Sequence, residues 1–185
     1  MVILGVIILA VVVVAVLIVV GMYNKLVRLK KQVSNAWSQI DVQLKRRCDL
    51  IPNLVETVKG YAGHESSVFE KVTQARSNAL AATGTGEKIA AETELTGVLR
   101  GLMVQVEAYP QLKANENFLH LQEELTSTEN KISFARQHYN DTATNYNTAI
   151  ALFPTNIIAG MFRFSEADLW QIVDSADREV PQVKF

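Results

Sequence analysis

Residues 1–22 read MVILGVIILAVVVVAVLIVVGM and carry no charged side chain. A helix that crosses about 30 Å of hydrocarbon needs about 20 apolar residues, so this run has the required length. Within lipid, a single segment satisfies its own backbone hydrogen bonds only as a helix. No basic side chain precedes the run and no small-x-small cleavage pattern ends it, which favours an uncleaved anchor over a signal peptide. The sequence therefore predicts a transmembrane helix at residues 1–22 and a second domain at residues 23–185.

The flank after this run is basic. Tyr23 suits the membrane interface, and the cations that follow it closely are Lys25, Arg28, Lys30 and Lys31. The positive-inside rule puts such a cluster in the cytoplasm, so we expect the N-terminus outside and the C-terminal domain inside the cell. The cluster is interpreted first as a topology signal. The alternative is that these five residues also contact anionic lipid head groups.

Composition narrows the class of protein further. The 185-residue chain has a formal net charge of -1, 8% aromatic residues and four prolines. Nucleic-acid-binding proteins usually carry a basic excess, so nucleic acid is not an expected partner. Few aromatic residues and few prolines favour helices over a sheet protein. Cys48 is the only cysteine, which excludes an intrachain disulfide and a zinc site built from cysteines.

Apolar residues beyond the anchor recur at steps of three and four, as in packed helices. Pro52 lacks a backbone donor, and the stretch at residues 60–63 is rich in glycine. Either the helix breaks at one of these places and gives a compact four-helix bundle, or it continues and later helices stack along it. Two seven-residue series define its apolar stripe: Leu26, Val33, Ile40, Leu54, Tyr61 and Val68, and beside them Trp37, Leu44, Ile51, Val58 and Val72.

Further helices follow a turn predicted by TGTG at residues 83–86. The next helix is expected to stop or bend at Pro110. Its apolar face consists of Leu95, Leu99, Leu102, Val106 and Tyr109.

The last long helix begins after a cap at Asn115 or Asn117 and ends at Pro154. A final short helix is expected after Ser165, over residues 167–176. Large residues of the long helix recur every seven positions, namely Phe118, Leu125, Ile132, Tyr139, Tyr146 and Phe153. The predicted fold is thus all-α: a transmembrane helix followed by an elongated antiparallel bundle of three to four long helices with coiled-coil-like packing.

Candidate sites for chemistry are weak. The HE pair at residues 64–65 has Val68 where a zinc protease needs its second histidine. His120 and His138 would lie about 27 Å apart along one helix, too far to share a metal. TGTGEK at residues 83–88 lacks the ending of a phosphate loop and follows no strand. We therefore assign no catalytic, cofactor or metal residue and expect no cofactor.

Arg47 is the most informative polar residue. It occupies a core position of the first seven-residue series, between Ile40 and Leu54. One hypothesis is that Arg47 pairs with a carboxylate such as Glu129 and fixes the register of the bundle. The other is that its side chain extends to the edge of the bundle.

Two further patterns leave alternatives open. Tyr-Asn pairs at residues 139–140 and 146–147 are interpreted as core tyrosines with flanking asparagines, and a binding face is the alternative. The apolar segment at residues 156–164 is too short to span a membrane. It lies on the membrane or covers the end of the bundle.

Three stretches resemble the LemA family: AWSQIDVQLKRRCDLIPNLVETVKGYAGHE at residues 36–65, AYPQLKANENFLHLQEELTSTENKISFARQHYNDTATNYN at 108–147, and FPTNIIAGMFRF at 153–164. The flank YNKLV at residues 23–27 is similar as well, so the resemblance covers nearly the whole chain. It implies a bacterial inner-membrane protein with a helical bundle and an N-terminus outside the cytoplasm. It implies no activity, because the biochemical role of the family is not established.

Three functions fit these observations. The first is a structural scaffold that self-assembles at the membrane, with lipids and further copies of the chain as partners. The second is a membrane-tethered adaptor that presents a helical face to another protein. An enzyme is the least expected, because no converging catalytic site is found.

Overall fold

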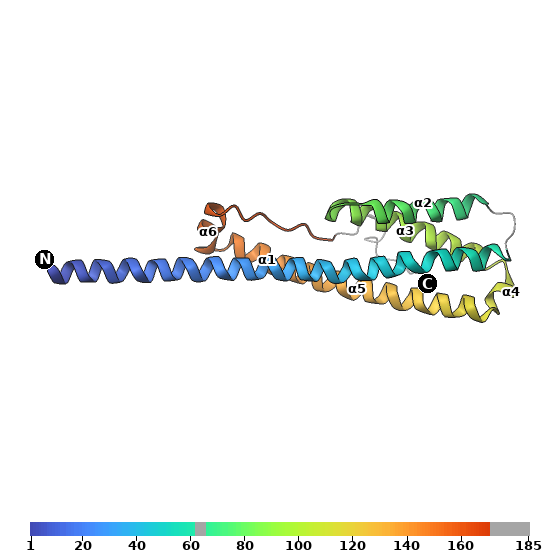
Figure 1. The fold of residues 1–185 in the computed structure, drawn as a ribbon, viewed down its shortest axis with the longest axis horizontal. Coiled ribbons are helices and arrows are strands. Elements are labelled where there is room, and N and C mark those ends of the chain that lie inside the picture. The colour runs from blue at the N-terminus through green and yellow to red at the C-terminus, as the bar shows by residue number, and fades with distance from the viewer. Residues whose placement is uncertain (62–65, 171–185) are drawn as a thin grey trace, which may run out of the picture. The chain divides into compact units, whose positions relative to one another are not determined.

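The computed structural model describes residues 1–61 and 66–170, and these residues form helices without any strand. The helices are α1 (Val2–Lys59), α2 (Ser66–Ala81), α3 (Thr85–Val106), α4 (Pro110–Lys113), α5 (Glu116–Ala151) and α6 (Thr155–Met161). Figure 1 shows them, coloured from blue to red along the chain. The predicted all-α class, with a long apolar helix first, is confirmed.

The N-terminal part of α1 is the candidate membrane span. Among the described residues, α1 is the one helix long and apolar enough to cross a membrane, with a mean hydropathy of 3.7 over an 18-residue window. None of that window is buried against the rest of the chain, in contrast to a core helix. The helix passes residue 22 without interruption. The division into a span at 1–22 and a domain at 23–185 stays a prediction.

α1 continues through Pro52 and ends at Lys59, before Gly60. A proline inside a helix leaves the carbonyl four residues earlier without its usual donor. Here that carbonyl belongs to Cys48, and Nε of Arg76 on α2 donates a hydrogen bond to it, with 2.7 Å between the two atoms. The neighbouring helix thus replaces the donor that Pro52 lacks, and the break falls at Gly60. Tyr61 lies past the helix end and is exposed, contrary to its predicted core position.

The chain divides into two compact units, each of which is described by itself. The first unit comprises Met1–Gln39 and Ala135–Leu169. In it, α1 and α5 run in opposite directions. The ring of Trp37 on α1 lies 5.3 Å from that of Tyr139 on α5, and the ring of Tyr23, earlier on α1, lies 4.7 Å from that of Phe162, which follows α5 and α6 in the chain. α6 and an extended segment complete this unit.

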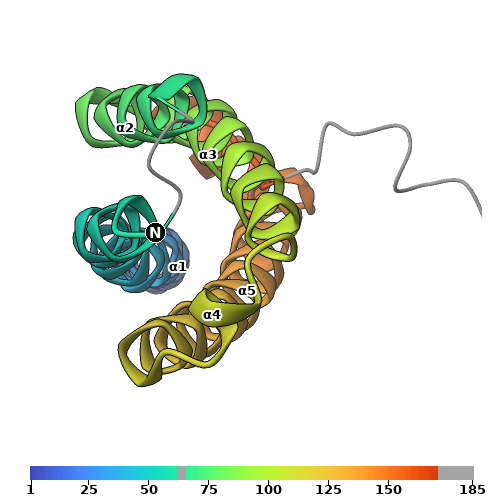
Figure 2. The ribbon, with the colours of Figure 1, turned by 90° about the vertical axis from the view of Figure 1, so that its right-hand side faces the viewer.

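The second unit comprises, among the described residues, Ile40–Phe134 and Trp170. α2, α3 and the N-terminal part of α5 form an arc around the C-terminal part of α1 (Figure 2). The predicted core positions of α1 are confirmed from Ile40 to Val58, and those of α3 at three of five places. The core cluster consists of Cys48, Ile51, Leu54, Val55, Val58, Phe69, Val72, Ala75, Ala79, Leu95, Leu102, Val106, Leu112 and Phe118.

The turns and helix ends agree in part with the sequence. Gly84 joins α2 to α3 with a φ of 90°, a conformation that glycine adopts without strain. The side chain of Asn115 accepts a hydrogen bond from the amide of Phe118 at 3.0 Å, so Asn115 is the cap of α5. α5 ends at Ala151, and Phe153 beyond it is 79% exposed rather than in the core. Residues 167–170 are not helical, so the predicted last helix is wrong there; its remainder, 171–176, lies outside the described residues.

Candidate functional site

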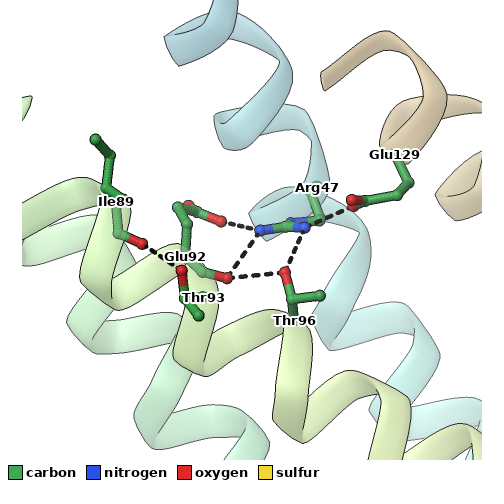
Figure 3. A network of polar contacts seen from close by, with 6 residues as sticks. All are labelled: Arg47, Ile89, Glu92, Thr93, Thr96 and Glu129. Carbon is green, nitrogen blue, oxygen red and sulfur yellow. Dashed lines mark hydrogen bonds and ion pairs between the residues drawn. The ribbon is translucent and has the colours of Figure 1, made fainter. Parts of the chain in front are cut away.

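A buried polar cluster forms around Arg47 in the second unit (Figure 3). Nη1 of Arg47 donates to Oε2 of Glu129 on α5 at 2.7 Å and to Oγ1 of Thr96 on α3 at 3.1 Å. Nη2 donates to Oε2 and to the backbone oxygen of Glu92, also on α3. The guanidinium group therefore joins α1, α3 and α5.

The helical periodicity of two elements explains why these groups meet. Arg47 lies in the stripe of α1 that faces inward, and only 3% of it is exposed. Glu92 and Thr96 lie four residues apart on α3, one turn from each other on the same face. The structure thus brings Arg47 and Glu129 together, as the pairing hypothesis requires. A role of this pair in fixing the register stays a prediction.

The sequence patterns did not identify Glu92 as a member of this cluster. It is 4% exposed and stands three residues before Leu95, so it extends the apolar face of α3 by one turn. A charged residue on such a face is the signal that would have identified it, because buried carboxylates need a partner.

Electrostatics distinguishes the two carboxylates. Burial raises the pKa of Glu92 above its ordinary range, and the nearby charge of Arg47 opposes that rise. The side chain of Glu129 is 47% exposed, so it stays in contact with water. The cluster is therefore one buried ion pair with a second, hydrated carboxylate at its edge. Two more accessible pairs flank it: Arg46 with Glu124, which is exposed, and Lys88 with Asp41, which is partly buried.

A shallow groove of 320 Å³ opens beside the cluster. Leu99, Met103 and Leu125 give it an apolar wall, and Arg47 and Glu129 border it. The polar groups point at the guanidinium group rather than at an open position for a substrate. In the described part of the chain, no group of three or more His, Cys, Asp or Glu side chains could hold a metal ion.

Cys48 is a packing residue in the structure. It is 2% exposed within the core cluster. Burial raises the pKa of its thiol to about 11, with Glu92 as the next contributor. A thiol in this state is a poor nucleophile at neutral pH.

The first unit contains a second polar arrangement, built from the Tyr-Asn pairs on α5. The hydroxyl groups of Tyr139 and Tyr146 donate to the backbone oxygens of Asp168 at 2.6 Å and Ser165 at 2.9 Å. The side chain of Asn147 donates to the backbone oxygen of Ala167 and accepts from its amide, at 2.9 and 2.8 Å. Both tyrosines are buried, as predicted. Their polar ends hold residues 165–168 as an extended segment, which explains why no helix forms there.

The residues of the basic flank lie on the exposed surface of α1. Tyr23 contacts the rings of Phe162 and Phe164, and Nζ of Lys30 lies 5.8 Å from the centre of the Phe164 ring. Lys25, Arg28 and Lys31 are exposed. Their contact with lipid head groups stays a prediction.

In the part of the chain that the structure describes, fold and site together define an all-helical protein with one candidate membrane span and a buried polar cluster that links three helices. Residues 36–185 match the profile of the LemA family. This chain belongs to that family, as the resemblance of its three stretches indicated.

Similar proteins are known from several bacteria. Protein LemA of Metamycoplasma hominis is 28% identical, over 89% of this chain and 73% of its own length. Magnetosome protein MamQ 2 of Paramagnetospirillum magneticum is 26% identical, over 85% of this chain and 68% of its own length. Magnetosome protein MamQ of Magnetospirillum gryphiswaldense is 25% identical, over 87% of this chain and 70% of its own length. None of these names specifies a reaction.

Proposed function

We propose that this protein is a non-catalytic scaffold that is anchored in the bacterial inner membrane and associates with further copies of itself. The apolar part of α1 is the anchor. The cations that follow it support an N-terminus outside and a C-terminal domain in the cytoplasm. Two observations support a non-catalytic role. The names of the similar proteins described above specify no reaction, and the polar cluster around Arg47 is arranged to hold helices together.

One observation supports the self-association: α5 presents an exposed face that the described residues of the chain do not cover. Phe134 is 73% exposed and Leu119 is 45% exposed. Between them the face is a shallow groove, bordered mainly by uncharged polar side chains such as Thr126, Ser127 and Asn130. Aromatic residues and a low density of charge are typical of the centre of protein interfaces. A second copy of the chain would bury this face.

The test is the mass of the full-length protein in mild detergent, measured by light scattering and electron microscopy. We expect a discrete assembly for the unaltered chain and a smaller species for Phe134→Glu. Val42→Glu is the matched control, because Val42 is also an exposed apolar residue of the second unit but lies on α1. A monomer at all accessible concentrations, or equal effects of both variants, would contradict the proposal.

The groove beside Arg47 favours a second candidate, a membrane-tethered adaptor. Its wall of Leu99, Met103 and Leu125 offers a place for one apolar side chain of a partner protein. A chain that stays monomeric but retains one partner in fixed ratio, and loses it on Met103→Glu, would support this function over the scaffold.

A further inference from the structure

A cluster of large apolar side chains is exposed around α6 in the first unit. Its members, here called the α6 apolar face, are Leu152, Phe153, Ile157, Met161 and Phe162, and their exposed fractions range from 49% to 79%. Single exposed apolar residues are common on proteins. Five of them in eleven consecutive residues form a patch, and patches of this kind mark a contact with something outside the chain.

Apart from Phe162, whose ring contacts that of Tyr23, the residues of this face are not what attaches α6 to the rest of the first unit. Ile158 and Ala159 are the buried residues of α6. Ile157 and Met161 lie four residues apart and so point to a common side of the helix, where both are exposed. α6 is therefore apolar both where it packs and where it is exposed, which is unfavourable for a helix that ends in water.

The position of α6 along α1 indicates what covers this face. The ring of Phe162 lies 4.7 Å from that of Tyr23, and the ring of Phe164 lies 5.9 Å from it. Tyr23 directly follows Met22, the last residue of the apolar run. Figure 1 shows α6 beside this part of α1. The α6 apolar face is thus level with the end of the candidate span.

We propose that the α6 apolar face inserts into the lipid interface and gives the protein a second membrane contact beside its span. The ring contact between Tyr23 and Phe162 places the α6 apolar face next to the end of the apolar run of α1, so one bilayer would cover both. Exposed cations that suit anionic head groups follow the apolar run of α1, namely Lys25, Arg28, Lys30 and Lys31, and Arg163 directly follows Phe162 in the chain. Among them, Nζ of Lys30 lies 5.8 Å from the centre of the Phe164 ring. The inference rests on the membrane anchor of the proposed function and is independent of self-association.

A second membrane contact restricts the orientation of the first unit relative to the membrane. A single span leaves its tilt and rotation to be set by interfacial anchors. The α6 apolar face, inserted in the lipid on one side of α1, opposes tilting of the helix toward the other side. The rings of Tyr23, Phe162 and Phe164 connect the α6 apolar face to α1.

The experiment places a nitroxide spin label on the face in the full-length protein, reconstituted in vesicles that contain anionic lipid. Ile157→Cys and Met161→Cys carry the label, and Asp141→Cys, on the exposed surface of α5, is the matched control. Cys48 is left in place because it is buried, and the unaltered chain measures its background labelling. Circular dichroism checks that the helix content of each variant is unchanged.

Collisions of the label with oxygen, which concentrates in lipid, and with a water-soluble nickel chelate give its depth. We expect labels at 157 and 161 about 5–10 Å below the head-group level, and the label at 141 in water. Collision with the chelate at 157 as frequent as at 141 would overturn the proposal. So would occlusion from both reagents with spin–spin broadening that disappears on dilution with unlabelled chain, because a second copy would then cover the face. The mass of the assembly is measured separately, so failure here is distinct from failure of the scaffold proposal.

Discussion

Replacing Arg47 with methionine tests the account of the polar cluster most directly. The substitution keeps an apolar stem of similar length but removes the guanidinium group. Glu129 keeps its water because its side chain is 47% exposed. Glu92 is 4% exposed and loses its charged partner. The expected loss of stability therefore comes chiefly from one buried carboxylate.

The size of this loss depends on pH. Without Arg47, the least costly state of Glu92 in the fold is the protonated one. A carboxyl with the ordinary pKa of 4.5 takes up a proton at pH 7 at a cost of about 3.4 kcal/mol, since each pH unit corresponds to 1.36 kcal/mol. At pH 5 the same cost is about 0.7 kcal/mol. We expect Arg47→Met to reduce the free energy of unfolding by about 3 kcal/mol at pH 7, in line with broken buried ion pairs, and by much less at pH 5.

The assay is urea unfolding of the full-length protein in mild detergent, followed by circular dichroism at pH 7 and pH 5. With a slope of about 2 kcal/mol per molar urea, the midpoint at pH 7 falls by about 1.5 M. Arg46→Met is the control, because Arg46 carries the same charge one residue away but pairs with Glu124 on the surface. Its midpoint is expected to change little. The double variant Arg47→Met/Glu92→Met removes both buried charges and should regain most of the lost stability.

Two results would refute this reasoning. An equal loss of stability at both pH values would mean that lost packing, rather than an unpaired carboxylate, is responsible. A loss for Arg46→Met as large as that for Arg47→Met would mean that burial of the pair is unimportant.

Three further outcomes are expected. The pKa of Glu92 is raised in the fold, so the folded state binds more protons than the unfolded state above pH 4.5. The free energy of unfolding therefore falls as the pH rises above 4.5. Glu92→Gln should flatten this pH dependence, as urea titrations at several pH values would measure. Arg76→Ala should cost about 1–3 kcal/mol in the native chain and less in a Pro52→Ala background, where the added amide replaces the missing donor, as a double-mutant cycle would measure. Asn147→Asp keeps the oxygen that accepts from the amide of Ala167 and should preserve its protection from hydrogen exchange, whereas Asn147→Ala should abolish it.

The periodicity of the sequence predicts which residues form much of the core, but it does not predict where the helices end. Ile40, Leu44 and Phe118 are buried where the seven-residue spacing places them. Phe153 follows the same spacing and is exposed, because α5 ends two residues earlier. A spacing rule assumes a continuous helix, so it fails at the first residue beyond one.

Pro52 and residues 165–168 show what local sequence cannot reveal. Pro52 is a helix breaker, yet α1 continues because Arg76, on another helix, supplies the missing donor to Cys48. Ser165 is a good helix cap, yet the segment after it is extended because side chains of α5 bind its backbone. In both places contacts from residues distant in the sequence outweigh local preference.

The sequence by itself predicted the candidate membrane span, the all-helical class and the burial of much of the core, and it left open whether Arg47 is paired or extends to the edge of the bundle. The predicted properties follow from the period of a helix and from the length of an apolar run, which one segment carries alone. The tertiary structure decided which carboxylate shares the buried position with Arg47, how α1 passes Pro52, and which backbone the asparagine and tyrosines of α5 bind. Each of these depends on an approach between separate helices. Such an approach is set by the packing of whole helix surfaces, and no single segment encodes it.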